Sequence, residues 1–200
     1  LIEKYNVPVL RYTSYPPANF FHEGYGEQEL IRAIEASNRQ EPSHLSFYIH
    51  LPYCNRMCHY CGCNAYPRTR HSSDSDYVEG VIREAEMVCS HIDPDRKIAQ
   101  IHYGGGSPST FDPELIAAIN ERLFSRFGAI NDPEIAIECH PGYMKATAYE
   151  RLADAGFNRM SIGIQDFNKE VLKASNRLSS LLPMDELFAL LRERRILINL

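Results

Sequence analysis

The sequence lacks the features that mark membrane-spanning, secreted or nucleic-acid-binding proteins. No apolar run approaches the roughly 18 residues that a spanning helix needs. A signal peptide begins with a charged segment followed by an apolar one, and Leu1 to Lys4 do not begin such a pattern, so no signal peptide is expected. The net charge of −5 disfavours nonspecific binding to nucleic acid or to an anionic membrane. A chain of 200 residues that is 44% apolar can nevertheless bury a core.

Cysteine is scarce outside one short stretch. Four of the six cysteines fall between Cys54 and Cys63, directly after the alternating apolar run 45–51. Cys54, Cys58 and Cys61 have the spacing C-x3-C-x2-C, and three thiolates on one loop suit a soft metal or an iron–sulfur cluster. One residue separates Cys61 from Cys63, which on an extended backbone turns the Cys63 side chain the other way. The spacing predicts a three-cysteine site that leaves one iron open.

A structural zinc site and a set of disulfides are two other interpretations of these cysteines. Structural zinc sites usually combine two ligand pairs separated by a longer loop, and no second pair is present. His50, His59 and His71 keep zinc open as a minor alternative. Four thiols within ten residues are too crowded for unstrained disulfides, and six cysteines in 200 residues are not a disulfide-rich composition. Thiols meant to bind iron fit a reducing cytoplasm.

The cysteine loop resembles the cluster loop of radical S-adenosylmethionine enzymes, in which three cysteines hold a 4Fe–4S cluster and the fourth iron binds S-adenosylmethionine. The longer stretch from Tyr48 to Asn64 is similar to one branch of that family, the oxygen-independent coproporphyrinogen III oxidases. A second segment, Arg11 to Pro16 (RYTSYP), resembles the same branch, with Leu10 where proline is expected. The similarity covers essentially the whole chain.

Strand and helix patterns alternate after residue 44. The expected strands are 45–51, 98–103, 134–139, 159–164 and a last one near 196–200, and the expected helices include 76–92, one after the N-cap Asp112, 147–155 and 184–194. This alternation predicts parallel strands with right-handed crossovers. The expected fold is therefore an α/β partial barrel of the radical SAM type.

The chain is also expected to be one part of a longer enzyme. It lacks an initiator methionine and stops inside the last apolar run, so the barrel is predicted to be truncated after about five strands. Residues 1–43 form a lead-in segment with the RYTSYP motif and a helical pattern at 27–39. Residues 44–200 form the incomplete barrel.

Unusual residues fall at the carboxyl ends of the expected strands, where the active sites of such sheets lie. The cysteine loop follows the first strand, Gly104 to Gly106 the second, and Gln165 the fourth. Glu138 closes the third strand, and alternation places it inside the barrel beside Ala136. An inward carboxylate is costly unless it is paired, which favours contact with a ligand.

The resemblance implies roles for these residues. Gly105, Gly106 and Ser107 would contact the methionine part of S-adenosylmethionine, with Ser107 in place of a more frequent threonine. Tyr60 would pack near the adenine, and Tyr48 would also contact the cofactor. The remaining implied positions are Gln165 and Arg177 for a second S-adenosylmethionine molecule, and Cys63, which is required for activity without binding iron. The glycines could instead form a plain turn, the tyrosines could be core, and Arg177 could be a surface cation.

The implied reaction is the conversion of coproporphyrinogen III to protoporphyrinogen IX. A 5′-deoxyadenosyl radical takes a hydrogen atom from a propionate side chain, and loss of CO2 and an electron leaves a vinyl group. A tetracarboxylate substrate requires a local cationic patch, for which the candidates are Arg11, Arg68, Arg70 and Arg177. Cys89 and Cys139 are expected to be structural.

The expected partners are the porphyrinogen and an electron donor of the flavodoxin or ferredoxin type, with no nucleic acid or membrane partner and a monomeric protein. Two alternatives from the same family stay open: an anaerobic haem-degrading methyltransferase and a haem chaperone-like paralogue. The chaperone relatives typically lack both the fourth cysteine and the RYTSYP segment, which are present here.

Overall fold

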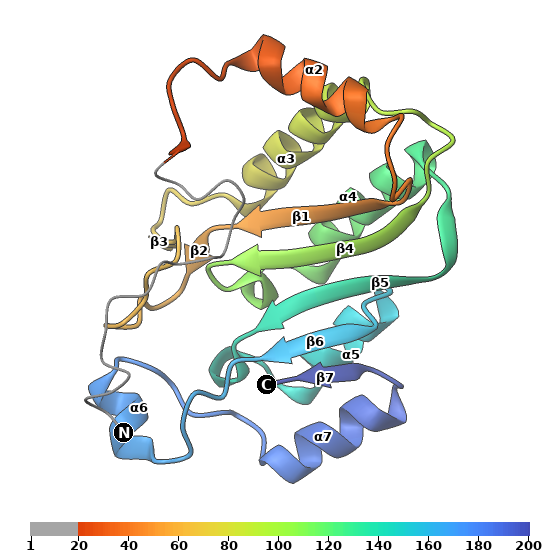
Figure 1. Ribbon diagram of the computed structural model, residues 1–200. Coiled ribbons are helices and arrows are strands. Elements are labelled where there is room, and N and C mark those ends of the chain that lie inside the picture. Colours follow the sequence, from red (N-terminus) through yellow and green to blue (C-terminus); the bar gives the residue numbers. More distant parts are fainter. Residues whose placement is uncertain (1–19) are drawn as a thin grey trace, which may run out of the picture.

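The computed structural model describes residues 20–200, which are built around one parallel β-sheet. Its five strands pair in the order β1-β4-β5-β6-β7, and each neighbouring pair is parallel. The strands are β1 (Leu45–Leu51), β4 (Ile98–Gly105), β5 (Ala129–Cys139), β6 (Arg159–Ile162) and β7 (Leu197–Asn199). All five point the same way, so their carboxyl ends share one edge of the sheet (Figure 1). The sheet is not closed. The predicted α/β fold with about five parallel strands is confirmed.

A first helix precedes β1, and the other helices lie between consecutive strands of the sheet. The helices are α2 (Glu27–Ser37), α3 (Asp74–Cys89), α4 (Pro113–Arg126), α5 (Ala146–Asp154), α6 (Lys169–Ala174) and α7 (Met184–Glu193). In Figure 1, α3, α4 and α5 lie behind the sheet, whereas the short helix α6 lies at the end where the strands finish. The 3-10 turns η2 (Pro108–Thr110) and η3 (Pro141–Tyr143) follow β4 and β5, and a small second sheet pairs β2 (Tyr53–Cys54) with β3 (Tyr66–Pro67).

Helix ends follow local capping signals. The Asp112 side chain accepts a hydrogen bond from the Glu114 N–H at 3.1 Å and starts α4 with Pro113 at the first position, as predicted. The Ser73 hydroxyl caps α3 by accepting from the Asp76 N–H, so this helix begins two residues earlier than the apolar spacing predicts. Helix α6 and the β2–β3 pair were not predicted, because elements this short leave no periodic pattern to read.

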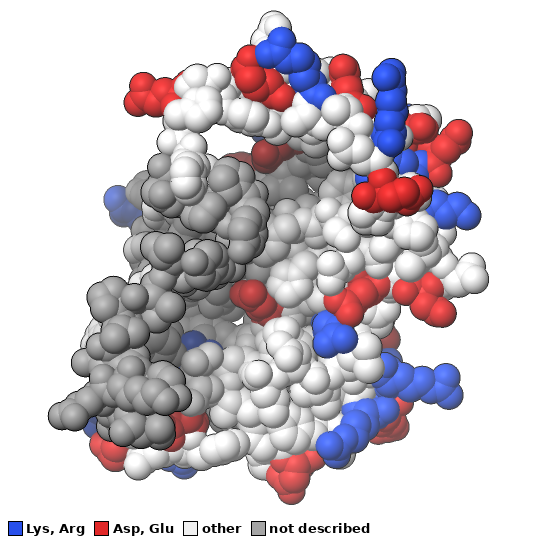
Figure 2. Space-filling view, viewed as in Figure 1, with Lys and Arg blue, Asp and Glu red and all other residues white. Residues whose placement is uncertain are grey.

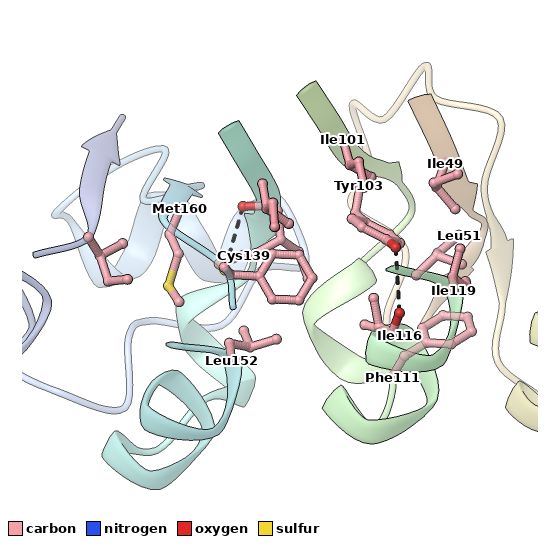
Figure 3. Packing of buried hydrophobic residues seen from close by; sticks show 14 of the residues in the cluster. Ile49, Leu51, Ile101, Tyr103, Phe111, Ile116, Ile119, Cys139, Leu152 and Met160 are labelled. Atoms are coloured by element: carbon pink, nitrogen blue, oxygen red, sulfur yellow. Dashed lines mark hydrogen bonds between the residues drawn. The ribbon is translucent and has the colours of Figure 1, made fainter. Parts of the chain in front are cut away.

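One face of the sheet is the hydrophobic core. Ile101 and Tyr103 on β4 and Met160 on β6 have no exposed surface and face the covering helices (Figure 3). Ile137 on β5 is equally buried in this core. The buried Tyr103 hydroxyl donates to the Asn120 side chain at 2.6 Å, which removes the cost of burying it. Cys89 and Cys139 are buried free thiols on this side.

The other face of the sheet is polar along its whole width. The register places Tyr48 beside His102, Glu138 beside Ser161, and Ser161 beside Asn199. Side chains alternate between the two faces of a strand, so these positions all point away from the helix-covered core. This polar face runs toward the carboxyl ends of the strands.

Helix α2 is tied to the rest of the fold through the residues that follow it. The Asn38 side chain donates to the His91 carbonyl at 2.9 Å, and Arg96 donates to the Ser37 hydroxyl at 3.0 Å. The predicted division near residue 44 stays a prediction. The RYTSYP segment and Arg11 lie outside the described residues. Within residues 20–200, no helix combines the length and the apolarity needed to cross a membrane.

Candidate active site

A cavity of about 520 Å³ opens at the carboxyl ends of the strands. It is lined by residues from the cysteine loop, the glycine turn after β4, the end of β5 and the segment after β6. Every predicted site residue except Tyr48 is among them: Cys54, Cys58, Tyr60, Cys61, Cys63, Gly105, Gly106, Ser107, Glu138, Gln165 and Arg177. Figure 2 looks onto the face of the sheet that the helices leave uncovered, and most of the Lys and Arg side chains seen there lie at the margins.

The three predicted cluster ligands sit at different depths in this cavity. Cys54 ends β2 and is buried, Cys58 is half-buried and Cys61 is exposed. The Ser107 hydroxyl donates to the Cys54 sulfur at 3.5 Å. Burial raises the pKa of Cys54, and the Ser107 hydrogen bond and the charge of Arg177 act in the opposite direction. Hydrogen-bond donors and a cation beside the sulfurs favour the thiolate form that binds iron.

These thiols do not gather around a single point. Within residues 20–200, no three side chains of His, Cys, Asp or Glu come close enough together to hold one metal ion. The predicted three-cysteine site is therefore not a preformed site for a single metal ion. In a 4Fe–4S cluster each cysteine binds a different iron, so ligands that line one cavity while staying apart fit a cluster better than a single zinc ion.

Cys63 lies on the same side as the other three thiols. It lines the cavity, and burial and the neighbouring Cys61 raise its pKa. The prediction that Cys63 points to the side opposite Cys61 is wrong, because the backbone is not extended between these residues. The chain bends here, and the Ala65 N–H donates to the Cys63 carbonyl at 2.8 Å.

The glycine turn packs directly on the start of the cysteine loop. The Gly106 N–H donates to the Leu51 carbonyl at 2.9 Å and the Ser107 N–H to the Tyr53 carbonyl at 3.1 Å. Gly105 has φ of 119°, a conformation that other residues rarely adopt. A Cβ on Gly106 would lie 2.4 Å from the Pro52 oxygen and 3.0 Å from the Cys54 sulfur. The turn is therefore more than a plain connection, because it fixes where Cys54 lies.

Glu138 points into the cavity, as strand alternation predicts. Its Oε1 lies 3.5 Å from the His102 Nε2, and its side chain remains 46% exposed, which leaves it free to contact a ligand. Tyr48 stacks on His102 with ring centroids 5.9 Å apart, and its hydroxyl lies 3.2 Å from the His50 Nδ1. Burial, followed by the charge of Glu138, raises the pKa of Tyr48. Tyr48 belongs to the polar face, and with 59% of its surface exposed it is not a core residue.

Arg177 is not an ordinary surface cation. Its Nη1 donates to the Cys58 sulfur at 3.4 Å, and its Nη2 donates to the Gly163 carbonyl. The buried Nε has no partner among the described residues. Gln165 lines the same cavity and has φ of 69°. The guanidinium therefore lies against the proposed cluster ligand Cys58.

Two histidines of the site were not predicted from the sequence. His102 lies on the polar face of β4, and the alternation that identified Glu138 also applies to it. His140 follows β5 and accepts from the Gly142 N–H at 3.1 Å through its Nδ1. Burial and the neighbouring Arg177 lower the pKa of His140 to about 4. This histidine is therefore neutral near pH 7.

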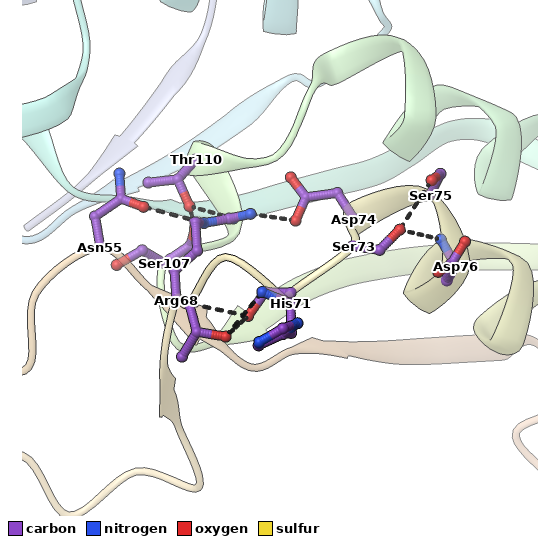
Figure 4. Close-up of polar contacts among 11 residues, drawn as sticks. Asn55, Arg68, His71, Ser73, Asp74, Ser75, Asp76, Ser107 and Thr110 are labelled. Carbon is purple, nitrogen blue, oxygen red and sulfur yellow. Dashed lines mark hydrogen bonds and ion pairs between the residues drawn. The ribbon is translucent and has the colours of Figure 1, made fainter.

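Of the candidates for a cationic patch, Arg177 lines the cavity, Arg68 and Arg70 have other partners, and Arg11 lies outside the described residues. Arg68 pairs with Asp74 and donates to Asn55 at 3.0 Å and to Thr110 at 3.3 Å (Figure 4). Its guanidinium also lies over the Tyr53 and Phe111 rings. Arg70 is exposed and donates to His71 instead. Among the described residues, the Lys and Arg side chains that line the cavity are Arg56 and Arg177.

Comparisons with known proteins show the family of the chain. A sequence model of the Radical SAM superfamily matches residues 48–198. Oxygen-independent coproporphyrinogen III oxidase from Escherichia coli (strain K12) is 39% identical over 201 residues, which cover 98% of this chain and 41% of the relative. The enzyme of the same name from Helicobacter pylori (strain 26695) is 35% identical over 195 residues, covering 95% and 42%. The chain thus spans about two fifths of the length of these curated relatives.

A solved structure extends the likeness to the fold. Coproporphyrinogen III oxidase (HemN) from Escherichia coli, which is described as a radical SAM enzyme, superimposes with a TM-score of 0.79 at 34% identity, covering 97% of this chain and 42% of that one. The five-stranded parallel sheet agrees with the partial barrel expected of such enzymes. The chain therefore belongs to the radical SAM superfamily, whose cofactors are a 4Fe–4S cluster and S-adenosylmethionine.

Proposed function

We propose that the protein of which this chain forms part catalyses the oxidative decarboxylation of coproporphyrinogen III propionates to vinyl groups, giving protoporphyrinogen IX. The observation that carries the proposal is one cavity lined by the three loop cysteines, the glycine turn, Glu138 and Cys63. The relatives described above carry the oxidase name and match along nearly the whole chain. This favours decarboxylation over haem methylation or haem transport.

Cys54, Cys58 and Cys61 would each hold one iron and leave the fourth iron free for the amino and carboxylate groups of S-adenosylmethionine. When bound, the cluster supplies the electron that cleaves the sulfonium bond and starts radical chemistry. The donor set fits this group, because all three thiols line one cavity and two of them accept hydrogen bonds, from Ser107 and Arg177.

The other residues of the cavity would bind and orient the cofactor. Gly105, Gly106 and Ser107 offer backbone groups and a hydroxyl to its methionine part. Glu138 offers an exposed carboxylate on the polar face, and Tyr60 offers a ring that is 57% exposed and can stack on adenine. Tyr48 would contact the cofactor from beside His102.

Gln165 and Arg177 are proposed to serve a second S-adenosylmethionine molecule. Arg177 has a planar fork suited to a carboxylate, although its Nη1 already faces Cys58. Cys63 is proposed to act without binding iron. Its position beside the other thiols supports a role in the same reaction.

We also propose that the electron donor is of the flavodoxin or ferredoxin type, that the protein is a monomer and that it works in the reducing cytoplasm. The net charge of −5 argues against nucleic acid as a partner. The six cysteines are free thiols, which fits a reducing environment.

The proposal is tested by an anaerobic assay of the full-length protein with coproporphyrinogen III, S-adenosylmethionine and a reductant. We expect protoporphyrin after oxidation of the product, and none from a Cys58→Ser variant. Cleavage of S-adenosylmethionine without porphyrin product would contradict the proposed substrate. Stoichiometric zinc with no iron after reconstitution would contradict the cluster itself.

A further inference from the structure

The end of helix α6 is fastened to the middle of the cysteine loop. The Asn176 side-chain amide donates to the Met57 carbonyl at 2.8 Å, and the His59 N–H donates to the Ser175 carbonyl at 3.1 Å. The His59 Nδ1 lies 3.1 Å from the Ala174 carbonyl, so this nitrogen carries the hydrogen and donates it. These contacts join segments separated by more than 110 positions and sit on both sides of Cys58.

The geometry of α6 depends on Asn176. This residue has φ of 59°, in the left-handed region that asparagine tolerates better than most residues. The turn closes with the Arg177 N–H donating to the Leu172 carbonyl at 2.7 Å. The carbonyls of Ala174 and Ser175 belong to the last turn, where helix carbonyls have no partner within the helix, and His59 supplies donors to both.

The end of α6 is anchored to the sheet. Leu172 of α6 is buried, and Arg177 reaches the Gly163 carbonyl just after β6. The loop has little structure of its own. Between Asn55 and Asn64, the backbone hydrogen bond that the loop makes to itself is the Cys61 N–H to the Cys58 carbonyl at 3.1 Å. Cys61 and Cys63 are exposed. The loop therefore depends on outside contacts to hold its thiols in place.

We propose that Asn176 and His59 are positioning residues that hold Cys58 in place for cluster binding, and that the end of α6 is a clamp on the cysteine loop. The inference rests on the proposed role of Cys58 as a ligand. Metal ligands need placement within a fraction of an ångström, which a loop without regular structure does not provide alone. The same clamp places the Arg177 Nη1 at the Cys58 sulfur.

The test compares Asn176→Asp with Asn158→Asp in the full-length protein. Each change removes one amide donor to a backbone carbonyl at 2.8 Å, but Asn158 bonds Pro133, away from the cavity. In metal-free protein, the alkylation rate of each cysteine by iodoacetamide is followed by mass spectrometry. Loss of about one hydrogen bond should speed labelling of Cys58 by about five- to ten-fold in Asn176→Asp and leave it unchanged in Asn158→Asp. Asn176→Gly, which keeps the backbone conformation accessible, should behave like Asn176→Asp.

After reconstitution with iron and sulfide, both Asn176 variants should lose iron to a chelator faster and show an altered EPR spectrum of the reduced cluster. Unchanged Cys58 labelling would overturn the proposal. So would an equal rise in Asn158→Asp, or a parallel rise at the buried Cys89, because either would indicate general loosening. If the wild-type protein took up zinc in place of iron, the proposed function would fail while the labelling result would still decide the clamp.

Discussion

Gly106 shows how closely the site is packed at the scale of one residue. A side chain there would meet the Pro52 carbonyl carbon and oxygen and the Cys54 sulfur, all within 3.0 Å. Two of these atoms are backbone and cannot rotate away. Glycine is therefore required at this position because the turn lies so close to the cysteine loop, whether or not a ligand also comes close.

Gly106→Ala should destabilise the protein by about 2 kcal/mol and reduce the iron bound per chain, because the turn must move away from Cys54. Chemical denaturation and iron analysis after reconstitution provide the measurement. The matched change Gly128→Ala, whose added Cβ meets nothing within 4 Å, should stay within about 0.5 kcal/mol of wild type. Equal effects at both glycines would show that close packing is not the cause.

At the scale of elements, the beginning of the cysteine loop is held by Arg68. Its side chain joins β3 to the start of α3 through Asp74, to the loop through Asn55 and to η2 through Thr110 (Figure 4). Side-chain exposure of the Arg68–Asp74 pair is 23% and 20%, so solvent screens it less than the surface pairs. Three elements around the site therefore share one cation.

Arg68→Ala should cost about 2 kcal/mol of unfolding free energy, because it leaves Asp74 without its charged donor and removes the stacking on Phe111. The control is Arg83→Ala, which breaks an exposed helix pair with Glu79 and should cost less than about 0.5 kcal/mol. Denaturation curves of both variants decide the matter. A loss at Arg68 no larger than that at Arg83 would show that the shared cation is not needed.

A second set of side-chain contacts joins neighbouring strands across the polar face of the sheet. Glu134 on β5 accepts hydrogen bonds at 2.7 Å from both Gln100 on β4 and Arg159 on β6. The Gln100 hydrogen bond, followed by the hydrogen bond and the charge of Arg159, lowers the pKa of Glu134 below its usual value. A lowered folded-state pKa stabilises the fold above the unfolded pKa, and that stability is lost as the pH falls.

Glu134→Gln should therefore destabilise the protein at pH 7 and have a smaller effect at an acidic pH below the lowered pKa of Glu134, where the wild-type side chain gains a proton. Urea denaturation at both pH values gives the difference between variant and wild type. A difference that does not shrink on acidification would contradict the ionised role of Glu134.

At the scale of the whole molecule, the proposed cluster would join parts of the fold that are distant in sequence. The cysteine loop contacts the glycine turn after β4 on one side and the end of α6 on the other. A group bound to the loop thus stabilises these contacts as well as itself. Binding to the folded state alone raises stability by mass action.

Removal of the cluster with a chelator under anaerobic conditions should lower Tm by several degrees and expose residues 55–65 to proteases. Each roughly 1 kcal/mol of linked binding free energy corresponds to about 2–4 °C for a domain of this size. Cys54→Ser should melt at the chelated Tm and not respond to the chelator. If the Tm of the wild-type protein stayed unchanged after chelation, the cluster would not contribute to the stability of the fold.

The sequence by itself determined the sheet, the strand order along the chain and the residues that meet at its carboxyl edge. Strand–helix alternation and the cysteine spacing are local patterns, and parallel strands bring their carboxyl ends together whatever lies between them. Tertiary structure alone decided the direction of Cys63, the pairing of Arg68 with Asp74, and the clamp of Asn176 on Met57. These depend on loop bends and on contacts between distant segments, where side-chain direction is set by packing and leaves no periodic trace in the sequence.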